Sequence, residues 1–261
     1  MQKNTLSPFK KHVLLFTLIA ISFFQFSFVS FRNDATANLI DAREKFFDAT
    51  LPFSYDPLAE TELSAPAVAS SLYEEMDLSA LGLEFRAFEY ALKGLGKIIQ
   101  EGIAKDNILT IADFSQPSTK KRLYVIDLEQ KEVLFNTYVA HGRNSGTAMA
   151  TRFSNTNSSF QSSLGFYRTA NTYRGKHGYS LRLEGLEKGI NHNALTRAIV
   201  MHAADYVSEQ TIRSLGYLGR SLGCPAVPKE LNKPIIDQIK DGSTLFIYHP
   251  SENYVGRSSL L

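Results

Sequence analysis

Apolar residues between positions 84 and 100 recur every three or four residues, which is the period of an α-helix. These residues are Phe85, Phe88, Leu92, Leu95 and Ile99. The spacing places them on one helical face, and we expect this face to pack against the domain that follows. We predict a second helix over 68–81 and a short one over 40–47, with a proline-containing linker between them.

From about residue 107 the pattern changes to short runs rich in branched and aromatic residues, which predict β-strands. The predicted strands cover 108–114, 122–128, 132–140, 180–183, 198–202 and 244–248. A polar turn at 129–131 joins the second and third of these into a hairpin. Two helices are expected among the later strands, one over 208–215 between a capping Ser208 and a terminating Gly216, and one over 229–240. The pattern predicts a mainly β domain preceded by short helices.

The stretch from 141 to 178 is rich in Gly, Ser, Asn and Thr, and we predict a long loop there. Loops of this length inside a compact domain are usually functional or disordered. Aromatic residues argue against disorder in this stretch. They are Phe153, Phe160, Phe166, Tyr167 and Tyr173. We therefore interpret 141–178 as a functional loop.

The N-terminus has the order of a secretory signal peptide. Lysines precede an uncharged apolar run over 13–31, and the small-residue pattern Ala35-Thr36-Ala37 follows. This order predicts a signal peptide over 1–37. The run is about 19 residues long and a spanning helix needs about 17–25, so an uncleaved membrane anchor is the alternative. In both cases the remainder is exported, and we expect it in the periplasm or cell envelope.

Cys224 is the only cysteine, and small residues and two prolines surround it. In an exported protein a lone cysteine has no partner for an internal disulfide. It must therefore be buried and inert, paired with another chain, or chemically active. A nucleophilic cysteine must ionise, and a thiol pKa of about 8.5 leaves only a few per cent of thiolate near neutrality. A neighbouring base, most naturally histidine, raises that fraction.

His202 is the best candidate for this base. It ends a short apolar run, and a histidine at the end of a buried strand is held by the sheet yet reaches its rim. The alternative is a structural histidine that donates to a backbone carbonyl. His141 and His177 lie beside glycines in the predicted loop, where they either line a substrate groove or are plain loop residues.

The backbone beside Cys224 suits acyl transfer, in which negative charge develops on the attacked carbonyl oxygen. Backbone N–H groups can stabilise this charge. Gly223 lets the chain approach a substrate closely, and Pro225 has no N–H to offer. The candidate donors are thus the N–H groups of Cys224, Gly223 and Leu222.

Five segments occur in an order that resembles the murein L,D-transpeptidase catalytic-domain family. The segments are 139–146, 162–165, 173–180, 200–208 and 216–228. The last contains Ser221-Leu222-Gly223-Cys224, which together with His202 is similar to the family's His…Ser-x-Gly-Cys signature. The resemblance covers roughly 107–250.

This resemblance implies a β-rich catalytic domain, a Cys224 nucleophile and a His202 base. Cys224 would attack the third residue of a tetrapeptide stem of peptidoglycan and release the terminal D-alanine. The acyl-thioester would pass to an amine of a neighbouring stem and form a 3→3 cross-link. The alternatives are an L,D-carboxypeptidase or hydrolase that uses the same site, and a non-catalytic wall-peptide-binding protein. The residues expected to contact the substrate are Ser221, Arg220, His141, His177 and Tyr179.

The chain also departs from the better-known branch of this family. Leu222 and Ala226 stand where that branch has histidine and arginine, and Ala203 follows His202 in place of glycine or serine. The missing arginine would hold an anionic donor stem, and Arg220 is its nearest replacement in the sequence.

These observations divide the chain into four parts. They are a signal peptide or anchor over 1–37, a helical N-terminal segment over 38–104, the catalytic domain over 105–250 and a C-terminal tail over 251–261. The net charge of +2 is too small to suggest a nucleic-acid partner. The family implies no metal or organic cofactor, and a membrane would be contacted only through an uncleaved N-terminus.

Overall fold

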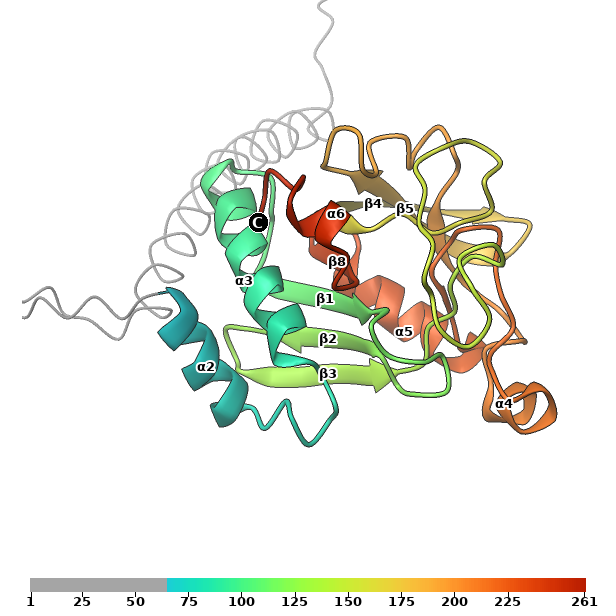
Figure 1. Ribbon diagram of the computed structural model, residues 1–261, viewed down its shortest axis with the longest axis horizontal. Helices are drawn as coiled ribbons and strands as arrows, with labels where there is room; N and C mark the ends of the chain where they lie inside the picture. Colours follow the sequence, from blue (N-terminus) through green and yellow to red (C-terminus); the bar gives the residue numbers. More distant parts are fainter. Residues whose placement is uncertain (1–64) are drawn as a thin grey trace, which may run out of the picture. The chain divides into compact units, whose positions relative to one another are not determined.

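The computed structural model describes residues 65–261. The predicted signal segment, the helix over 40–47 and most of the linker lie outside this range and stay predictions. The helices are α2 (Ala65–Glu75), α3 (Phe85–Gln100), α4 (Glu209–Leu215), α5 (Lys229–Ile239) and α6 (Glu252–Val255) (Figure 1). The strands are β1 (Ile108–Asp113), β2 (Leu123–Asp127), β3 (Glu132–Thr137), β4 (Gly165–Gly175), β5 (Gly178–Gly185), β6 (Val200–Ala203), β7 (Ala226–Val227) and β8 (Thr244–Tyr248).

These strands form one sheet in the order β3-β2-β1-β8-β4-β5-β6-β7. β8 comes last in the chain yet lies inside the sheet, parallel to β1 and antiparallel to β4. A bridge between Ala140 and Ala226 connects the chain just beyond β3 to β7. The sheet is therefore nearly closed and barrel-like, and the prediction of a mainly β domain is confirmed.

Apolar side chains of α3 and α5 cover the sheet. α3 packs against β1 and β8, and its predicted apolar face supplies the buried Phe88 and Leu95. α5 packs against β5 and β6 through three buried isoleucines. Phe166 of β4 stacks on Phe246 of β8, with ring centroids 4.1 Å apart, and so joins neighbouring strands in the core.

Several predicted elements are confirmed with small changes at their ends. These are the helices over 84–100, 208–215 and 229–240, and the strands over 108–114, 122–128 and 244–248. The hairpin of β2 and β3 is also confirmed. The helix predicted over 68–81 begins earlier and ends at Glu75, because a series of tight turns follows in which Asp77 has a positive φ of 47°. β3 ends before the predicted boundary, at Thr137.

The prediction of a single loop over 141–178 is wrong, since it contains β4, the longest strand of the part described. The aromatic residues Phe166 and Tyr167, which argued against disorder, are both buried in this strand, but the surrounding Gly, Asn and Thr residues favoured the interpretation as a loop. The pairing partners of β4 also come later in the chain. The two-residue strand β7 and the short helix α6 were not predicted.

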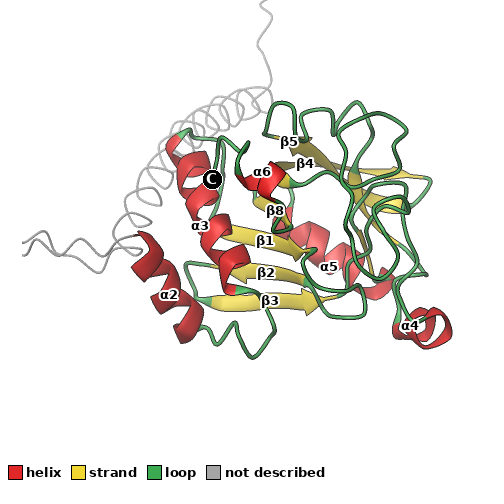
Figure 2. Cartoon of the chain, viewed as in Figure 1, coloured by secondary structure: helices red, strands yellow, loops and turns green. Residues whose placement is uncertain are grey.

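Residues after β8 pack onto the domain. Tyr254 and Leu260 are buried in the core, and Glu187 holds this tail through hydrogen bonds from Tyr254 and Ser258. No helix between residues 65 and 261 has the length and apolarity needed to cross a bilayer. The long loops gather on the side of the sheet away from α2 and α3 (Figure 2).

Candidate active site

The loop that carries Cys224 is built around the hydroxyl of Ser221. Ser221 Oγ accepts a hydrogen bond from Gly223 N at 3.0 Å and donates one to Cys224 O at 2.6 Å. The Ser221 backbone pairs with the 141–143 segment through His141 O at 3.0 Å and Arg143 N at 2.8 Å. Ser221 is buried. It therefore shapes the loop, and we assign it no contact with substrate.

Gly223 has a backbone conformation that only glycine adopts easily. Its φ is +126°, and a Cβ atom there would lie 2.8 Å from Gln161 O. Its carbonyl accepts from Ser162 Oγ at 3.1 Å. Since Gly223 N–H is already bonded to Ser221, it is a poor candidate for an oxyanion donor. Within residues 65–261 the N–H groups of Leu222 and Cys224 have no hydrogen-bond partner.

The thiol of Cys224 is half-buried and rests against the chain that leads into β6. Val200 N–H points to the sulfur at an N···Sγ distance of 3.5 Å, and Ala198 O lies 3.8 Å from the sulfur. Burial raises the pKa of this thiol, while the Val200 N–H and the charge of Arg197 lower it. Partial burial therefore disfavours the thiolate, while the Val200 N–H and the charge of Arg197 favour it.

His202 lies on β6, opposite Ala226 of β7 and Ser180 of β5. Cys224 lies two residues before Ala226, so the pairing of β6 with β7 brings the thiol and the histidine to the same end of the sheet. His202 Nδ1 is 2.8 Å from Ala203 O. A proton on Nδ1 satisfies that carbonyl and leaves Nε2 with a free lone pair. Within the range described, the thiol and the imidazole make no hydrogen bond to each other.

His177 covers His202. It is exposed on the β4–β5 hairpin, and its ring stacks on that of His202 with centroids 4.3 Å apart and planes inclined by 24°. His202 is only 3% exposed. Burial lowers the pKa of His202, the Ala203 carbonyl opposes this, and His177 lowers the pKa further. Both factors keep His202 neutral, which is the form able to accept a proton.

His141 is fully buried and does not line a groove. Its Nδ1 lies 2.8 Å from Arg122 Nη2, and Arg122 is itself fully buried. Burial and then the charge of Arg122 lower the pKa of His141 to about 4. His141 supports the Cys224 loop through its backbone, and we assign it no contact with substrate.

The side chains of Tyr179 and Arg220 also bind other parts of the protein and not the ring of His202. Tyr179 alternates with Ser180 along β5, so its side chain lies on the face opposite His202, and its hydroxyl donates to Asp237 of α5 at 2.8 Å. Arg220 Nη1 donates to Gly146 O at 3.2 Å, and its guanidinium lies 5.3 Å from the centre of the Tyr217 ring. Of the predicted substrate residues, only His177 lies against the histidine of the site.

Arg197 was missed by the sequence analysis. Its guanidinium donates to Gln161 O at 2.7 Å, directly under the Cys224 loop. The only signal in the sequence is a basic residue five positions before His202, at the start of an apolar run.

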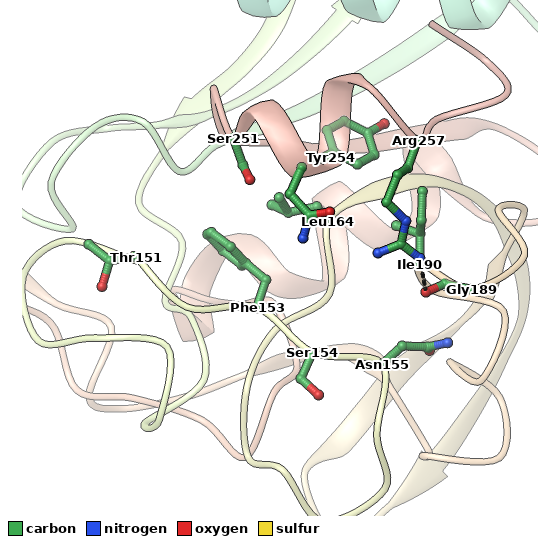
Figure 3. A pocket seen from close by; sticks show the side chains of 11 residues that line it. Thr151, Phe153, Ser154, Asn155, Leu164, Gly189, Ile190, Ser251, Tyr254 and Arg257 are labelled. Carbon is green, nitrogen blue, oxygen red and sulfur yellow. Dashed lines mark hydrogen bonds between the residues drawn. The ribbon is translucent and has the colours of Figure 1, made fainter.

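A pocket of about 310 Å³ is lined in part by Ser154 (Figure 3), whose carbonyl accepts a hydrogen bond from Arg197. Phe153, Asn155 and Tyr254 are among its lining residues, and Arg257 at one side donates to Gly189 O at 3.3 Å. None of the predicted site residues lines it. Between residues 65 and 261, no group of three or more His, Cys, Asp or Glu side chains is arranged to hold a metal ion.

Comparison with known families identifies one matching family model. The family model of the L,D-transpeptidase catalytic domain matches residues 79–248. No curated protein matches the chain.

Solved structures of L,D-transpeptidases are similar at low identity. One from Mycobacterium smegmatis is 15% identical with a TM-score of 0.34, and covers 55% of this chain and 59% of that one. One from Mycobacterium tuberculosis is 13% identical with a TM-score of 0.36, and covers 55% and 58%. One from Enterococcus faecium is 12% identical with a TM-score of 0.34, and covers 55% and 50%. The match thus spans less than two thirds of each of these chains.

Proposed function

This chain belongs to the L,D-transpeptidase catalytic domain family, and we propose that it is an exported cysteine acyltransferase acting on peptidoglycan stem peptides. The observation that carries the proposal is the thiol of Cys224, held by Val200 N–H at the end of the strand that bears His202. The product is a 3→3 cross-link between two stems.

In the acylation step, Cys224 attacks the carbonyl carbon of the third residue of a tetrapeptide donor. His202 Nε2 takes the thiol proton as the carbon–sulfur bond forms. The Cys224 N–H, with that of Leu222 as a second donor, stabilises the oxyanion, an interaction worth on the order of 3 kcal/mol per donor. The tetrahedral intermediate then breaks its bond to the terminal D-alanine, whose amine leaves with the proton held by His202.

In the second step, an amine of a neighbouring stem attacks the thioester and His202 accepts its proton. Collapse of this intermediate releases the thiol, which recovers the proton, and leaves a new amide bond between the stems. Water in place of the amine gives an L,D-carboxypeptidase. Arg220 is tied to Gly146 O, so we propose that it holds the Cys224 loop in place.

Mass spectrometry of muropeptides tests this proposal. Purified protein is incubated with tetrapeptide muropeptides, and the products of the wild type and of Cys224→Ala are compared. Dimers with 3→3 bonds that depend on Cys224 support the transpeptidase. Shortened monomers mean carboxypeptidase or hydrolase activity, and binding without turnover means a wall-peptide-binding protein.

We also propose export to the periplasm or cell envelope, on the basis of the lysines, apolar run and Ala35-Thr36-Ala37 site at the N-terminus. A reporter that is active only outside the cytoplasm, fused after Leu261, should be active. N-terminal sequencing should begin at Asn38 after cleavage, or at Met1 of a membrane-bound protein if the segment is an anchor. A soluble cytoplasmic protein would refute export.

A further inference from the structure

Arg197 is fixed by four hydrogen bonds next to the loop of Cys224. Its Nη1 donates to Ser154 O at 2.8 Å and Ser163 Oγ at 2.5 Å. Its Nη2 donates to Ser159 Oγ at 3.2 Å and Gln161 O at 2.7 Å. A guanidinium has five N–H groups, so all four on the two Nη atoms are used. Arg197 therefore has no pair of free Nη N–H groups with which to bind a substrate carboxylate.

Within residues 65–261 the charge of Arg197 has no carboxylate partner. The ion pairs found between residues 65 and 261 all involve other cations. Arg197 is half-buried, and a partly buried cation is costly unless an anion compensates it. The oxygens that surround it are carbonyls and hydroxyls, which leave its net charge unbalanced.

Cys224 is the group placed to balance this charge. A Cβ atom on Gly223, the residue before Cys224, would lie 3.3 Å from Arg197 Nη2. The chain from Arg197 then turns through Ala198, whose φ of +53° is unusual for a residue other than glycine. This turn brings Ala198 O and Val200 N to the sulfur. Strain of this kind is often found at functional sites.

We propose that Arg197 is a positioning residue that fixes the loop beneath Gly223 and supplies the positive charge that stabilises the Cys224 thiolate. This inference rests on the proposed role of Cys224 as nucleophile. A lowered thiol pKa raises the fraction of thiolate, the form that attacks a carbonyl.

The other ionisable groups around Cys224 do not supply a fixed cation. His202 is kept neutral by the factors that lower its pKa, and His177 reaches the site only through His202. Burial, and secondarily the charge of Cys224, raise the pKa of Tyr206 to about 12, so it is neutral at pH 7. In the loop itself, the Arg220 side chain is bonded to Gly146 O. In the adjacent segment, Arg143 lies over the Phe160 ring at 4.2 Å.

The test measures the apparent thiol pKa from the pH dependence of iodoacetamide alkylation in the full chain. Arg197→Gln should raise the thiol pKa and slow alkylation at neutral pH, about tenfold for each unit of increase. Arg197→Lys keeps the charge, so it should largely retain the wild-type pKa while lowering turnover through loss of the forked bonds. Arg257→Gln, at the side of the pocket in Figure 3, is the matched control and should leave alkylation unchanged.

An unchanged thiol pKa in folded Arg197→Gln overturns the inference. If that variant does not fold, Arg197→Lys decides: a thiol pKa near the wild-type value supports the role of charge, and a clear rise above the wild-type value refutes it. Alkylation needs no wall peptide. Failure to form 3→3 cross-links would therefore refute the proposed function without changing this result.

Discussion

At the scale of single residues, the chemistry of the site depends on how His202 is enclosed. Its Nδ1 is held by the adjacent Ala203 carbonyl, and its ring is covered by that of His177. The carbonyl sets which nitrogen is free, and the cover keeps the ring neutral. The Ala203 carbonyl orients the imidazole of His202, and the His177 ring lowers its pKa. The two contacts can therefore be tested by different substitutions.

His177→Ala should shift the pH dependence of acylation. It removes the cover and a neighbouring charge, both of which lower the pKa of His202. The rate falls as pH drops through that pKa, because a protonated imidazole cannot accept a proton. The acid limb of kcat/KM should therefore lie below about pH 6.5 in the wild type and move to higher pH in the variant. Lys176→Ala on the same hairpin is the control, and an equal shift there would contradict the role of stacking.

His202→Ala should lower the acylation rate by about 10²–10⁴-fold, the range for loss of a general base. Rapid-quench detection of the acyl-enzyme measures this rate directly. The effect should exceed that of His141→Gln, since His141 is fully buried away from the surface of the site. A larger loss of rate in a folded His141 variant would mean that the wrong histidine is assigned.

Cys224 and His202 could be singled out from the sequence because each lies in a distinctive local pattern. Arg197 could not, since its four acceptors lie between Ser154 and Ser163 and are brought to it only by the fold. His141 shows the opposite case: a glycine-rich neighbourhood suggested exposure, yet packing against Arg122 buries it completely.

At the scale of elements, α3 fits the sheet through the absence of a side chain. A Cβ atom on Gly94 would lie 2.0 Å from Phe166 Cζ of β4, whereas one on Gly96 would have nothing within 4 Å. The aromatic ring that stacks on Phe246 therefore occupies the space that Gly94 leaves. Close packing of α3 against β4 at this position therefore requires glycine at residue 94.

Substituting Gly94 or Gly96 of α3 by alanine should change the free energy of unfolding in opposite directions. Gly94→Ala should destabilise the protein by about 1–3 kcal/mol, because the Phe166 ring must move. Gly96→Ala should stabilise it by about 0.5–1 kcal/mol through the higher helix propensity of alanine. Chemical denaturation of both variants measures the two free energies of unfolding. Equal changes in the two would show that α3 does not pack closely at Gly94.

Elements with strong local periodicity, such as α3 and the β2–β3 hairpin, could be predicted because their pattern is complete within a few residues. β4 and β7 could not. β4 is defined by pairing with β5 and β8, and β7 consists of two residues that pair with β6. For these strands the deciding contacts are distant in the sequence, and local composition is a poor guide.

At the scale of the whole molecule, Glu187 joins distant parts of the chain. Its carboxylate accepts from Phe166 N of β4 at 2.7 Å, from Tyr254 of α6 at 3.2 Å and from Ser258 of the tail. The side chain is 1% exposed, and burial raises its pKa. The tail is held to the sheet by this buried acid.

Glu187→Ala should destabilise the protein by about 1–3 kcal/mol, because buried donors lose their acceptor. Glu187→Gln can keep the three contacts and should be much milder. A raised folded-state pKa means that the stability from Glu187 is lost as pH rises through that pKa. Stability relative to Glu187→Gln should therefore decline from below pH 4.5 toward neutrality. Thermal unfolding across this range measures it, and a difference that does not change with pH would show that folding does not raise the pKa of Glu187.

The position of β8 between β1 and β4 has a consequence for how the domain folds. The strands β1–β3 and β4–β7 are paired through β8, which follows all of them in the chain. Without Thr244–Tyr248, β1 and β4 each lack the partner strand that lies between them, so completing the sheet requires this strand. A chain that lacks this strand would leave the sheet open between β1 and β4.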